Sequence, residues 1–237
     1  GTLPLGGSTL DVIGPITRTV RDAAVMLDVL AGYAAADRKT IAGVGTRPLG
    51  GYAAGLDGFE ISGKRLGLYG PGWRSKTAGR RGDPLHADIE QAYRAAQQAL
   101  QASGVSLVDD PFAGSGFADL AVIAPGIDEY DARGMESLPY DLELFLQGLG
   151  PRAALKSFAA FAAATQSQDP FARDGVLNYL AGFAEFEACR ADPSRPPALD
   201  SFFAAREAYL SIFNAVMDRW CLDGLVYPQM CDPAPRR

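Results

Sequence analysis

Residues 64–108 read KRLGLYGPGWRSKTAGRRGDPLHADIEQAYRAAQQALQASGVSLV, and this stretch decides the fold class. Residues 64–69 form a short apolar run that stops at glycine and proline, which predicts a buried strand. Residues 105–108 predict a second strand, and the residues between the two runs carry helical spacing. Strand, helix and strand at this spacing predict a βαβ unit with a right-handed parallel strand pair, and therefore an α/β fold.

The helix of this unit is expected to run from Asp83 to Ser103. Asp83 would cap it, and Pro84 suits the first helical position. Glu90 and Arg94 stand four residues apart, so they predict an ion pair along one helix face. The glycine that follows Ser103 is the expected end of the helix.

Further elements are predicted on both sides of this unit. Thr17 or Thr19 is expected to cap a helix that stops at Gly32. Residues 36–58 are rich in glycine and polar residues, which predicts a long surface excursion. Helices are also expected at 138–149, at 153–165 (well buried, from its Ala and Phe content) and at 201–220, and a last short strand is expected at 225–228.

The composition is that of a folded globular chain. Its 237 residues are 48% hydrophobic and 21% charged, which excludes wholesale disorder. The 22 Lys and Arg against 28 Asp and Glu give a net charge of −6. A nucleic acid is therefore not expected as a partner, because a phosphate backbone attracts a basic surface. The chain has no apolar run of about 18 residues, so no membrane partner is expected either.

The three cysteines, Cys189, Cys221 and Cys231, are too few and too irregularly spaced for a disulfide framework. Free thiols are typical of a reducing compartment, so we expect a cytoplasmic location. The chain contains no Cys-x-x-Cys pair, which argues against a structural zinc site. No metal and no cofactor is predicted.

His86 is the single histidine, so it alone could serve as an imidazole base. It stands just inside a predicted helix start, where a solvent-facing side chain is expected. If the protein is a hydrolase, we therefore expect it to work without imidazole.

Residues 8–32 read STLDVIGPITRTVRDAAVMLDVLAG. This block resembles one of the amidase signature family, in which a loop of the form S-x-D-x-x-G-P-x-x-R-(S/T)-V-x-D-A-A leads into a helix. Residues 64–111 and 201–230 are also similar to elements of that family. The positions of the block that fit are Ser8 or Thr9, Asp11, Gly14, Pro15, Arg18, Thr19, Val20, Asp22, Ala23 and Ala24.

The resemblance implies a fold and an activity. The implied fold has α/β/α layers with a mixed sheet flanked by helices, incomplete in this chain. Residues 1–237 would form a single domain fragment, in which 112–200 is a variable, mostly helical region on the substrate side. The implied activity is hydrolysis of a carboxamide C–N bond through a serine acyl-enzyme, without a cofactor.

In that family a Lys-Ser-Ser triad precedes the block that resembles residues 8–32. The Gly-Gly-Ser at 6–8 directly abuts Thr9-Leu10-Asp11, which places it in the loop rather than in the nucleophile motif. We therefore expect the catalytic segments upstream of this chain, and no catalytic residue within it. The lysines all lie downstream of the block: Lys39, Lys64, Lys76 and Lys156.

The family-motif residues Asp11, Gly14, Pro15 and Arg18 are expected to fix their loop. An arginine fork and a carboxylate that accepts backbone N–H groups are effective at holding a loop through hydrogen bonds. The alternative is that Asp11 and Arg18 shape the pocket or orient the substrate.

Tyr227, Pro228 and Gln229 are the candidates for a substrate pocket. They stand at the carboxyl end of the last predicted strand, and open α/β sheets place ligands at the carboxyl ends of their strands. The alternative is that these residues only complete the strand end.

Two charged clusters are expected to be solvated loops. The acidic residues at 128–131 lack a second group of metal-ligating spacing. The basic residues at 74–81 could hold a phosphate or an acidic partner, but a solvated loop is the simpler interpretation.

Three functions follow as alternatives. The first is an amidase that acts on a small-molecule amide. The second is a non-catalytic or degenerate amidase-like domain that binds a partner or has a structural role. The third is the amide-hydrolysing component of a tRNA-dependent amidotransferase. Homodimer formation is left open, and the identity of the amide does not follow from the sequence.

Overall fold

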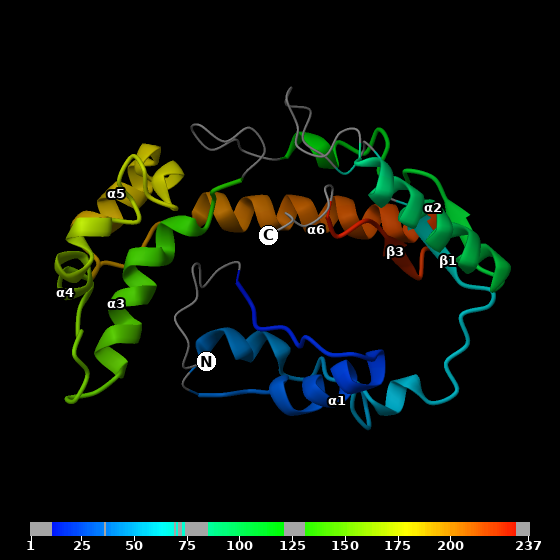
Figure 1. Ribbon diagram of the computed structural model, residues 1–237, viewed down its shortest axis with the longest axis horizontal. Coiled ribbons are helices and arrows are strands. Elements are labelled where there is room, and N and C mark those ends of the chain that lie inside the picture. Colours follow the sequence, from blue (N-terminus) through cyan, green and yellow to red (C-terminus); the bar gives the residue numbers. More distant parts are fainter. Residues whose placement is uncertain are drawn as a thin grey trace. The chain divides into compact units, whose positions relative to one another are not determined.

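The computed structural model describes residues 11–35, 37–68, 70, 73, 85–120 and 131–230. The chain divides into two compact units, each built from two stretches of sequence. One comprises Gly1–Glu60 and Gly134–Leu199, and the other comprises Ile61–Arg133 and Asp200–Arg237. Figure 1 labels α1 to α6, β1 and β3.

The second unit contains a small parallel sheet. Its strands are β1 (Arg65–Leu68), β2 (Ser106–Val108) and β3 (Gly224–Val226), in the order β2-β1-β3. β1 pairs in parallel with both neighbours, so the predicted parallel pair of the βαβ unit is confirmed. A mixed sheet is not what the described strands form, because all three run in the same direction. The α/β class is confirmed, at the level of this small sheet and its helices.

Gly67 lies in the middle of β1, between β2 and β3. A Cβ atom at this position would lie 2.8 Å from the ring of Pro111 and 2.9 Å from the side chain of Leu225. The absence of a side chain at Gly67 therefore lets the residues after β2 and within β3 close over the central strand.

Helix α2 (Ala87–Ala102) connects β1 to β2. Its cap is His86, whose Nδ1 accepts a hydrogen bond from the backbone N–H of Asp88 at 3.2 Å. The predicted cap Asp83 thus stands three residues before the observed cap, and Asp83 itself lies outside the described residues. The predicted Glu90–Arg94 ion pair is confirmed, with 2.5 Å between the charged atoms.

Helix α6 (Asp200–Trp220) leads into β3 and fulfils the prediction of a helix at 201–220. Phe202, Ala205 and Val216 are its buried residues. Asp223, between α6 and β3, accepts hydrogen bonds from the backbone N–H of Arg65 and from the Lys64 ammonium, both at 2.9 Å. This carboxylate holds the start of β3 against the start of β1.

The stretch 134–199 is helical. Its elements are the 3₁₀ turns η5 (Met135–Ser137), η6 (Gln166–Gln168) and η7 (Asn178–Gly182) and the α-helices α3 (Leu138–Gly148), α4 (Phe158–Ala164) and α5 (Ala184–Ala191). Phe158, Phe171, Leu180 and Phe186 are buried and form its core. The helix expected at 153–165 is shorter than predicted and is not well buried, because within α4 only Phe158 lies in the core.

The stretch 11–60 contains α1 (Val20–Leu30), capped by Thr19, which is one of the two predicted caps. Asp28 on this helix accepts hydrogen bonds from the backbone N–H groups of Tyr52 at 2.7 Å and Ala53 at 3.1 Å. Arg47 also donates to Asp28, at 3.0 Å. The predicted surface excursion therefore returns to α1 at this carboxylate. Its short 3₁₀ turns are η1 (Arg38–Gly43) and η2 (Ala54–Leu56).

Candidate functional site

The carboxyl ends of the three parallel strands meet at one edge of the sheet in the second unit. Trp73 follows β1, Phe112 follows β2 and Tyr227 follows β3. The ring centroids of Trp73 and Phe112 are 5.0 Å apart in an edge-to-face arrangement, and those of Trp73 and Tyr227 are 5.7 Å apart. Open α/β sheets bind ligands at this edge, which makes it the candidate site.

Tyr227, Pro228 and Gln229 directly follow β3, at the edge where the sequence places them. Tyr227 packs one side of its ring on Trp73 and exposes 54% of its surface. Pro228 is half-buried, and Gln229 is exposed. The three residues therefore lie on the solvent-exposed side of the candidate site. Their role as a pocket wall stays a prediction.

The aromatic wall formed by Trp73, Phe112 and Tyr227 packs on further aromatic side chains beneath it. Phe112 is almost fully buried, and its ring lies 4.9 Å from that of Phe117 and 5.8 Å from that of Phe213 on α6. Trp220, at the end of α6, donates from its indole N–H to the carbonyl of Pro111 at 3.1 Å. The turn after β2 is thereby fixed by the last turn of α6.

The turn after β2 also approaches the turn after β1. Asp110 adopts a left-handed backbone with φ of 35°, which is uncommon for a residue with a side chain. A Cβ atom added to Gly70 would lie 2.3 Å from the Cβ of Asp110. The glycine thus allows the two strand ends to come together at the candidate edge.

Tyr93 supports the same edge from α2. Its hydroxyl donates to the carbonyl of Val226, the last residue of β3, at 2.9 Å. Burial raises the pKa of Tyr93 to about 12, so the phenol keeps its proton at neutral pH. Tyr93 is therefore a hydrogen-bond donor to the strand end and not a base.

A polar cluster flanks the aromatic wall. The Arg133 guanidinium donates to Asp131 through Nε at 2.9 Å and Nη2 at 2.5 Å, and also to the carbonyl of Leu120 at 2.5 Å. Tyr209, whose ring packs on Phe117 at 5.2 Å, contacts the same guanidinium. The hydrogen bond to Asp131 raises the pKa of Arg133, and burial raises the pKa of Tyr209. Asp131 is thus not a solvated carboxylate as predicted, but the partner of a half-buried arginine.

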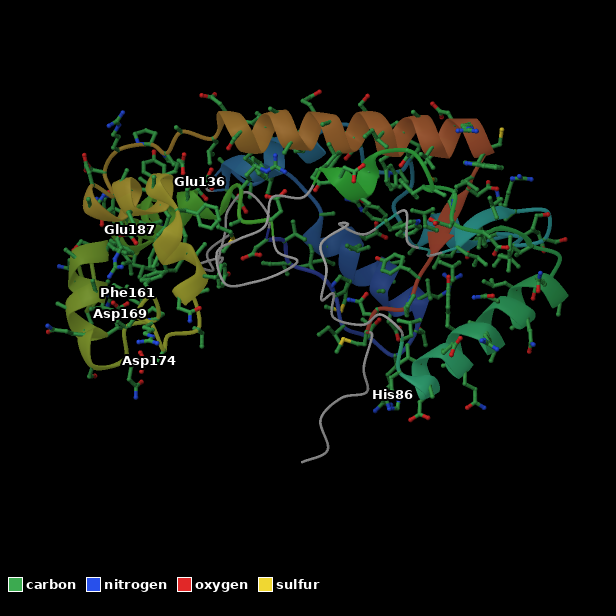
Figure 2. All side chains as sticks on the ribbon, turned by 90° about the horizontal axis from the view of Figure 1, so that it is seen from above. His86, Glu136, Phe161, Asp169, Asp174 and Glu187 are labelled. Carbon is green, nitrogen blue, oxygen red and sulfur yellow. The ribbon has the colours of Figure 1, made fainter. Side chains whose placement is uncertain are left out.

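His86, which could act as a base, and the cysteine thiols, which could act as nucleophiles, are placed unfavourably for these roles. His86 lies exposed at the start of α2 (Figure 2), as predicted. Cys189 is buried, and burial raises the pKa of its thiol. Cys221 is exposed, with its Sγ 3.6 Å from the carbonyl of Asp218. Within the described ranges, no group of three His, Cys, Asp or Glu side chains could hold a metal ion.

The family-motif residues lie in the other unit, in the segment that leads to α1. Asp11 and Pro15 are half-buried, whereas Gly14 and Arg18 are exposed. Their role in fixing the loop stays a prediction. Ser8 and Thr9, the basic residues at 74–81 and the acidic residues at 128–130 lie outside the described residues.

Trp73, Phe112, Tyr93 and Arg133 are site residues that sequence reasoning missed. A signal for the first two exists, because each stands shortly after a predicted strand and a proline. Tyr93 carries no local signal, since its partner Val226 is distant in the sequence. Asp131 stands two residues before Arg133 and is a local signal for that ion pair, whereas the contact of Arg133 with the carbonyl of Leu120 has no such signal.

Among the helices that the structure describes, none is long and apolar enough to cross a membrane.

Comparisons with known proteins find partial similarity. The chain is 36% identical over 104 residues to a glutamyl-tRNA(Gln) amidotransferase subunit of Nitratidesulfovibrio vulgaris (strain DP4), a match that covers 44% of this chain and 19% of that protein. It is 33% identical over 120 residues to the corresponding protein of Desulforapulum autotrophicum, covering 50% and 23%. It is 39% identical over 101 residues to an amidase of Pseudomonas putida, covering 43% and 19%.

The matched stretch is thus a small part of each of these relatives, and about half or less of this chain. No family model matches the chain, and no solved structure matches it significantly. The proteins similar to this chain nevertheless include both an amidase and amidotransferase subunits. Over part of its length the chain is therefore similar to an amidase and to amidotransferase subunits, which agrees with the resemblance drawn from residues 8–32.

Proposed function

We propose that the protein hydrolyses the C–N bond of a small carboxamide. The observation that carries the proposal is the 39% identity over 101 residues to a protein named amidase. The aromatic edge formed by Trp73, Phe112 and Tyr227 supports it, because such a surface can contact the apolar part of a small substrate.

The reaction we propose is acyl transfer through serine. A serine hydroxyl attacks the amide carbon, and backbone N–H groups stabilise the resulting oxyanion. The C–N bond then breaks, the leaving nitrogen takes a proton and departs as ammonia or an amine, and water hydrolyses the acyl ester. In this proposal the reacting serine and its lysine lie outside residues 1–237, because no segment of this sequence resembles the family's triad segments.

The placement of His86, Cys189 and Cys221 supports the proposal that none of these three residues takes part in the reaction. The imidazole is exposed at a helix start, and the buried thiol is held in its neutral form by a raised pKa. The third group, the exposed Cys221 thiol, lies beside the carbonyl of Asp218 at the end of α6 rather than beside a base. These placements support a serine mechanism without imidazole.

Ammonia release from a panel of amides tests the proposal. The panel should include aliphatic, aromatic and amino-acid amides, and the enzyme should be the protein as its gene encodes it. The 237-residue chain is the matched control, which we expect to be inactive. Turnover by the encoded protein that disappears when its candidate serines are replaced supports the proposal, and no turnover on any amide contradicts it.

A second function is favoured by the names of several relatives. Proteins similar to this chain include subunits of glutamyl-tRNA(Gln) amidotransferases, so we propose as the alternative that it is the amide-hydrolysing component of such an enzyme. Activity would then depend on partner proteins. Affinity purification from the source organism that recovers no second component would count against this alternative.

A further inference from the structure

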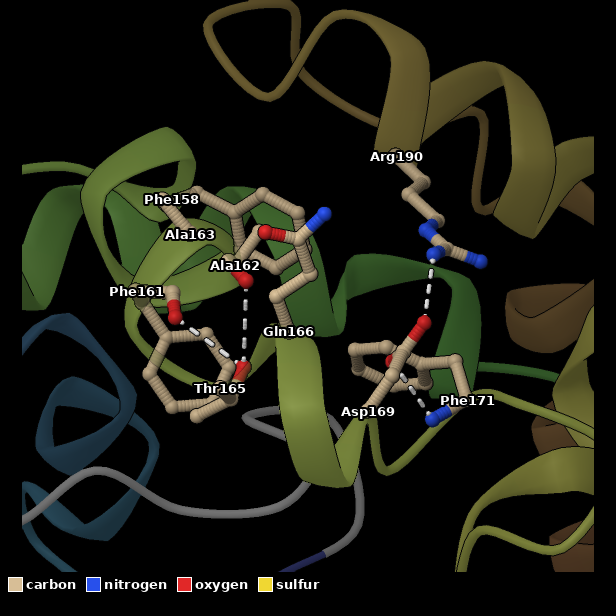
Figure 3. Close-up of a pocket in the computed structure, with 9 residues that line it drawn as sticks. All are labelled: Phe158, Phe161, Ala162, Ala163, Thr165, Gln166, Asp169, Phe171 and Arg190. Atoms are coloured by element: carbon tan, nitrogen blue, oxygen red, sulfur yellow. Dashed lines mark hydrogen bonds and ion pairs between the residues drawn. The ribbon is translucent and has the colours of Figure 1, made fainter.

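The helical stretch 134–199 contains a cavity of about 360 Å³. This volume lies within the range of roughly 300–1,000 Å³ that is typical of small-molecule sites. Figure 3 shows the residues around it, which all come from α4, the segment after it and α5. The cavity is therefore built within one of the two compact units.

One face of α4 provides the apolar side of the cavity. Phe158, Phe161, Ala162 and Thr165 stand at positions i, i+3, i+4 and i+7, which is the spacing of a single helix face. Phe158 and Phe171 are buried, so they form a fixed apolar floor. Ala162 is exposed, and its short side chain leaves the space open.

The start of α4 is held in place by two side chains. Ser157 caps the helix by accepting a hydrogen bond from the backbone N–H of Ala160 at 3.1 Å. Glu143 on α3 accepts one from the N–H of Phe158 at 2.5 Å. The phenylalanine face is thereby fixed relative to α3, and the cavity has a preorganised wall.

The opposite side of the cavity is polar. Asp169 accepts hydrogen bonds from Arg190 at 3.1 Å and from the backbone N–H of Phe171 at 2.9 Å (Figure 3). The Arg190 guanidinium also lies over the ring of Phe171, 5.3 Å from its centroid. Both charged side chains are about one-third exposed, so they remain accessible to a ligand.

The charge of this polar side disfavours an anion. Arg190 faces two carboxylates, because Glu187 on α5 lies 4.0 Å from its Nη1 in addition to Asp169. A carboxylate ligand would meet a guanidinium whose charge is already compensated. A neutral carboxamide is better matched, since its carbonyl oxygen can accept from the guanidinium while its N–H₂ group donates to the carboxylate.

We propose that this cavity is a binding site for an uncharged amide that carries an aromatic or compact apolar group. The apolar group would lie against Phe158, Phe161 and Phe171, and the amide would lie at the Arg190–Asp169 pair. The choice of an amide rests on the proposed function, whereas the fit to an aromatic group rests on the cavity alone.

The first test is binding of phenylacetamide to the 237-residue chain, followed by ligand-observed nuclear magnetic resonance and titration. Ala162→Leu fills the cavity from an exposed position, so the fold should be kept, and we expect it to weaken binding by about tenfold or more. Ala164→Leu is the matched control, because Ala164 is an exposed residue of the same helix that does not line the cavity. Equal binding by both variants would overturn the proposal.

The second test compares phenylacetamide with phenylacetate. We expect the amide to bind more tightly to the unchanged chain. Asp169→Asn keeps an acceptor for the N–H of Phe171 but removes one negative charge, so it should shift the preference toward phenylacetate by about tenfold. Phenylacetate binding that equals amide binding in the unchanged chain would contradict the assignment of an amide.

Hydrolysis by the encoded protein separates failure of this inference from failure of the proposed function. If no amide is hydrolysed but Ala162→Leu still abolishes phenylacetamide binding, the cavity is a binding site and the proposed function is wrong. If amides are hydrolysed and Ala162→Leu does not weaken phenylacetamide binding, the inference is wrong and the proposed function stands, because its candidate site is the separate edge at Trp73, Phe112 and Tyr227.

Discussion

Trp73 and Tyr227 lie with their ring centroids 5.7 Å apart, although one follows β1 and the other follows β3. Their contact exists because β3 pairs directly with β1, with Leu68 opposite Val226 at the end of the ladder. The contact joins the two strand ends that form the candidate edge.

This contact should appear as an energetic coupling between the two side chains. In a double-mutant cycle of Trp73→Leu and Tyr227→Leu, we expect a coupling free energy of about 0.5–1 kcal/mol, as for other aromatic pairs. Urea unfolding of the four proteins measures it. Phe203 packs on Phe202 instead, so Trp73→Leu with Phe203→Leu is the control and should be additive within error.

Gly67→Ala should destabilise the protein by about 2 kcal/mol, because overpacking a closed core position costs on the order of 1–3 kcal/mol. The new methyl group would meet Pro111 and Leu225 at less than van der Waals distance. Gly148→Ala is the control, since its added Cβ meets nothing within 4 Å, and it should leave the free energy of unfolding equal or slightly raised. Equal effects of the two substitutions on urea unfolding would contradict the described packing of β1.

Asp28 should make the docking of residues 47–53 on α1 sensitive to acid. The hydrogen bonds from Ala53 and Tyr52 lower its pKa below the ordinary value of 3.8. Since the folded pKa is the lower one, the stabilisation is fully present above the unfolded pKa and is lost as the pH falls through the folded pKa. Hydrogen-exchange protection at Tyr52 and Ala53 should fall over that range.

Asp28→Asn tests the assignment of this acid sensitivity. The variant should show low protection at Tyr52 and Ala53 at every pH, because an amide accepts these hydrogen bonds less strongly than a carboxylate. Arg47→Gln is the control that keeps both backbone hydrogen bonds, and it should retain most of the protection. Protection in the unchanged chain that does not depend on pH would show that Asp28 does not hold this segment.

Tyr93 should titrate late and stabilise the end of β3. Burial raises its pKa to about 12, so its stabilisation is fully present below the unfolded value and is lost as the pH rises through the folded value. Tyr93→Phe should remove a late step from the ultraviolet titration of phenolate and cost about 1 kcal/mol through the lost hydrogen bond to Val226. Tyr33→Phe, at an exposed position, should leave stability unchanged.

Local signals in the sequence predicted the βαβ unit well. Gly70, Pro71 and Gly72 end the predicted strand, and Gly104 ends the predicted helix. The residues between these breaks have helical spacing, so the strand and the helix are both specified by residues adjacent in the sequence. The start of α2 was placed too early because Asp83-Pro84 is a good helix beginning by composition, whereas the helix described by the structure is capped by His86.

The tertiary contacts could not be predicted in the same way. The approach of Trp73 to Tyr227 depends on the strand order β2-β1-β3, which no local pattern encodes. The burial of α4 was overestimated because its alanines and phenylalanines do not reveal which face is covered. In the structure Ala162 and Ala163 are exposed and border a cavity instead.

We propose that the protein hydrolyses amides with a serine that lies outside residues 1–237. Labelling the protein encoded by the gene with a fluorophosphonate, which reacts with activated serines, and mapping the label by mass spectrometry test this claim most directly. We expect one labelled serine outside residues 1–237, with labelling blocked by an amide substrate. A label on a serine within residues 1–237, or no label on a protein that hydrolyses amides, would contradict it.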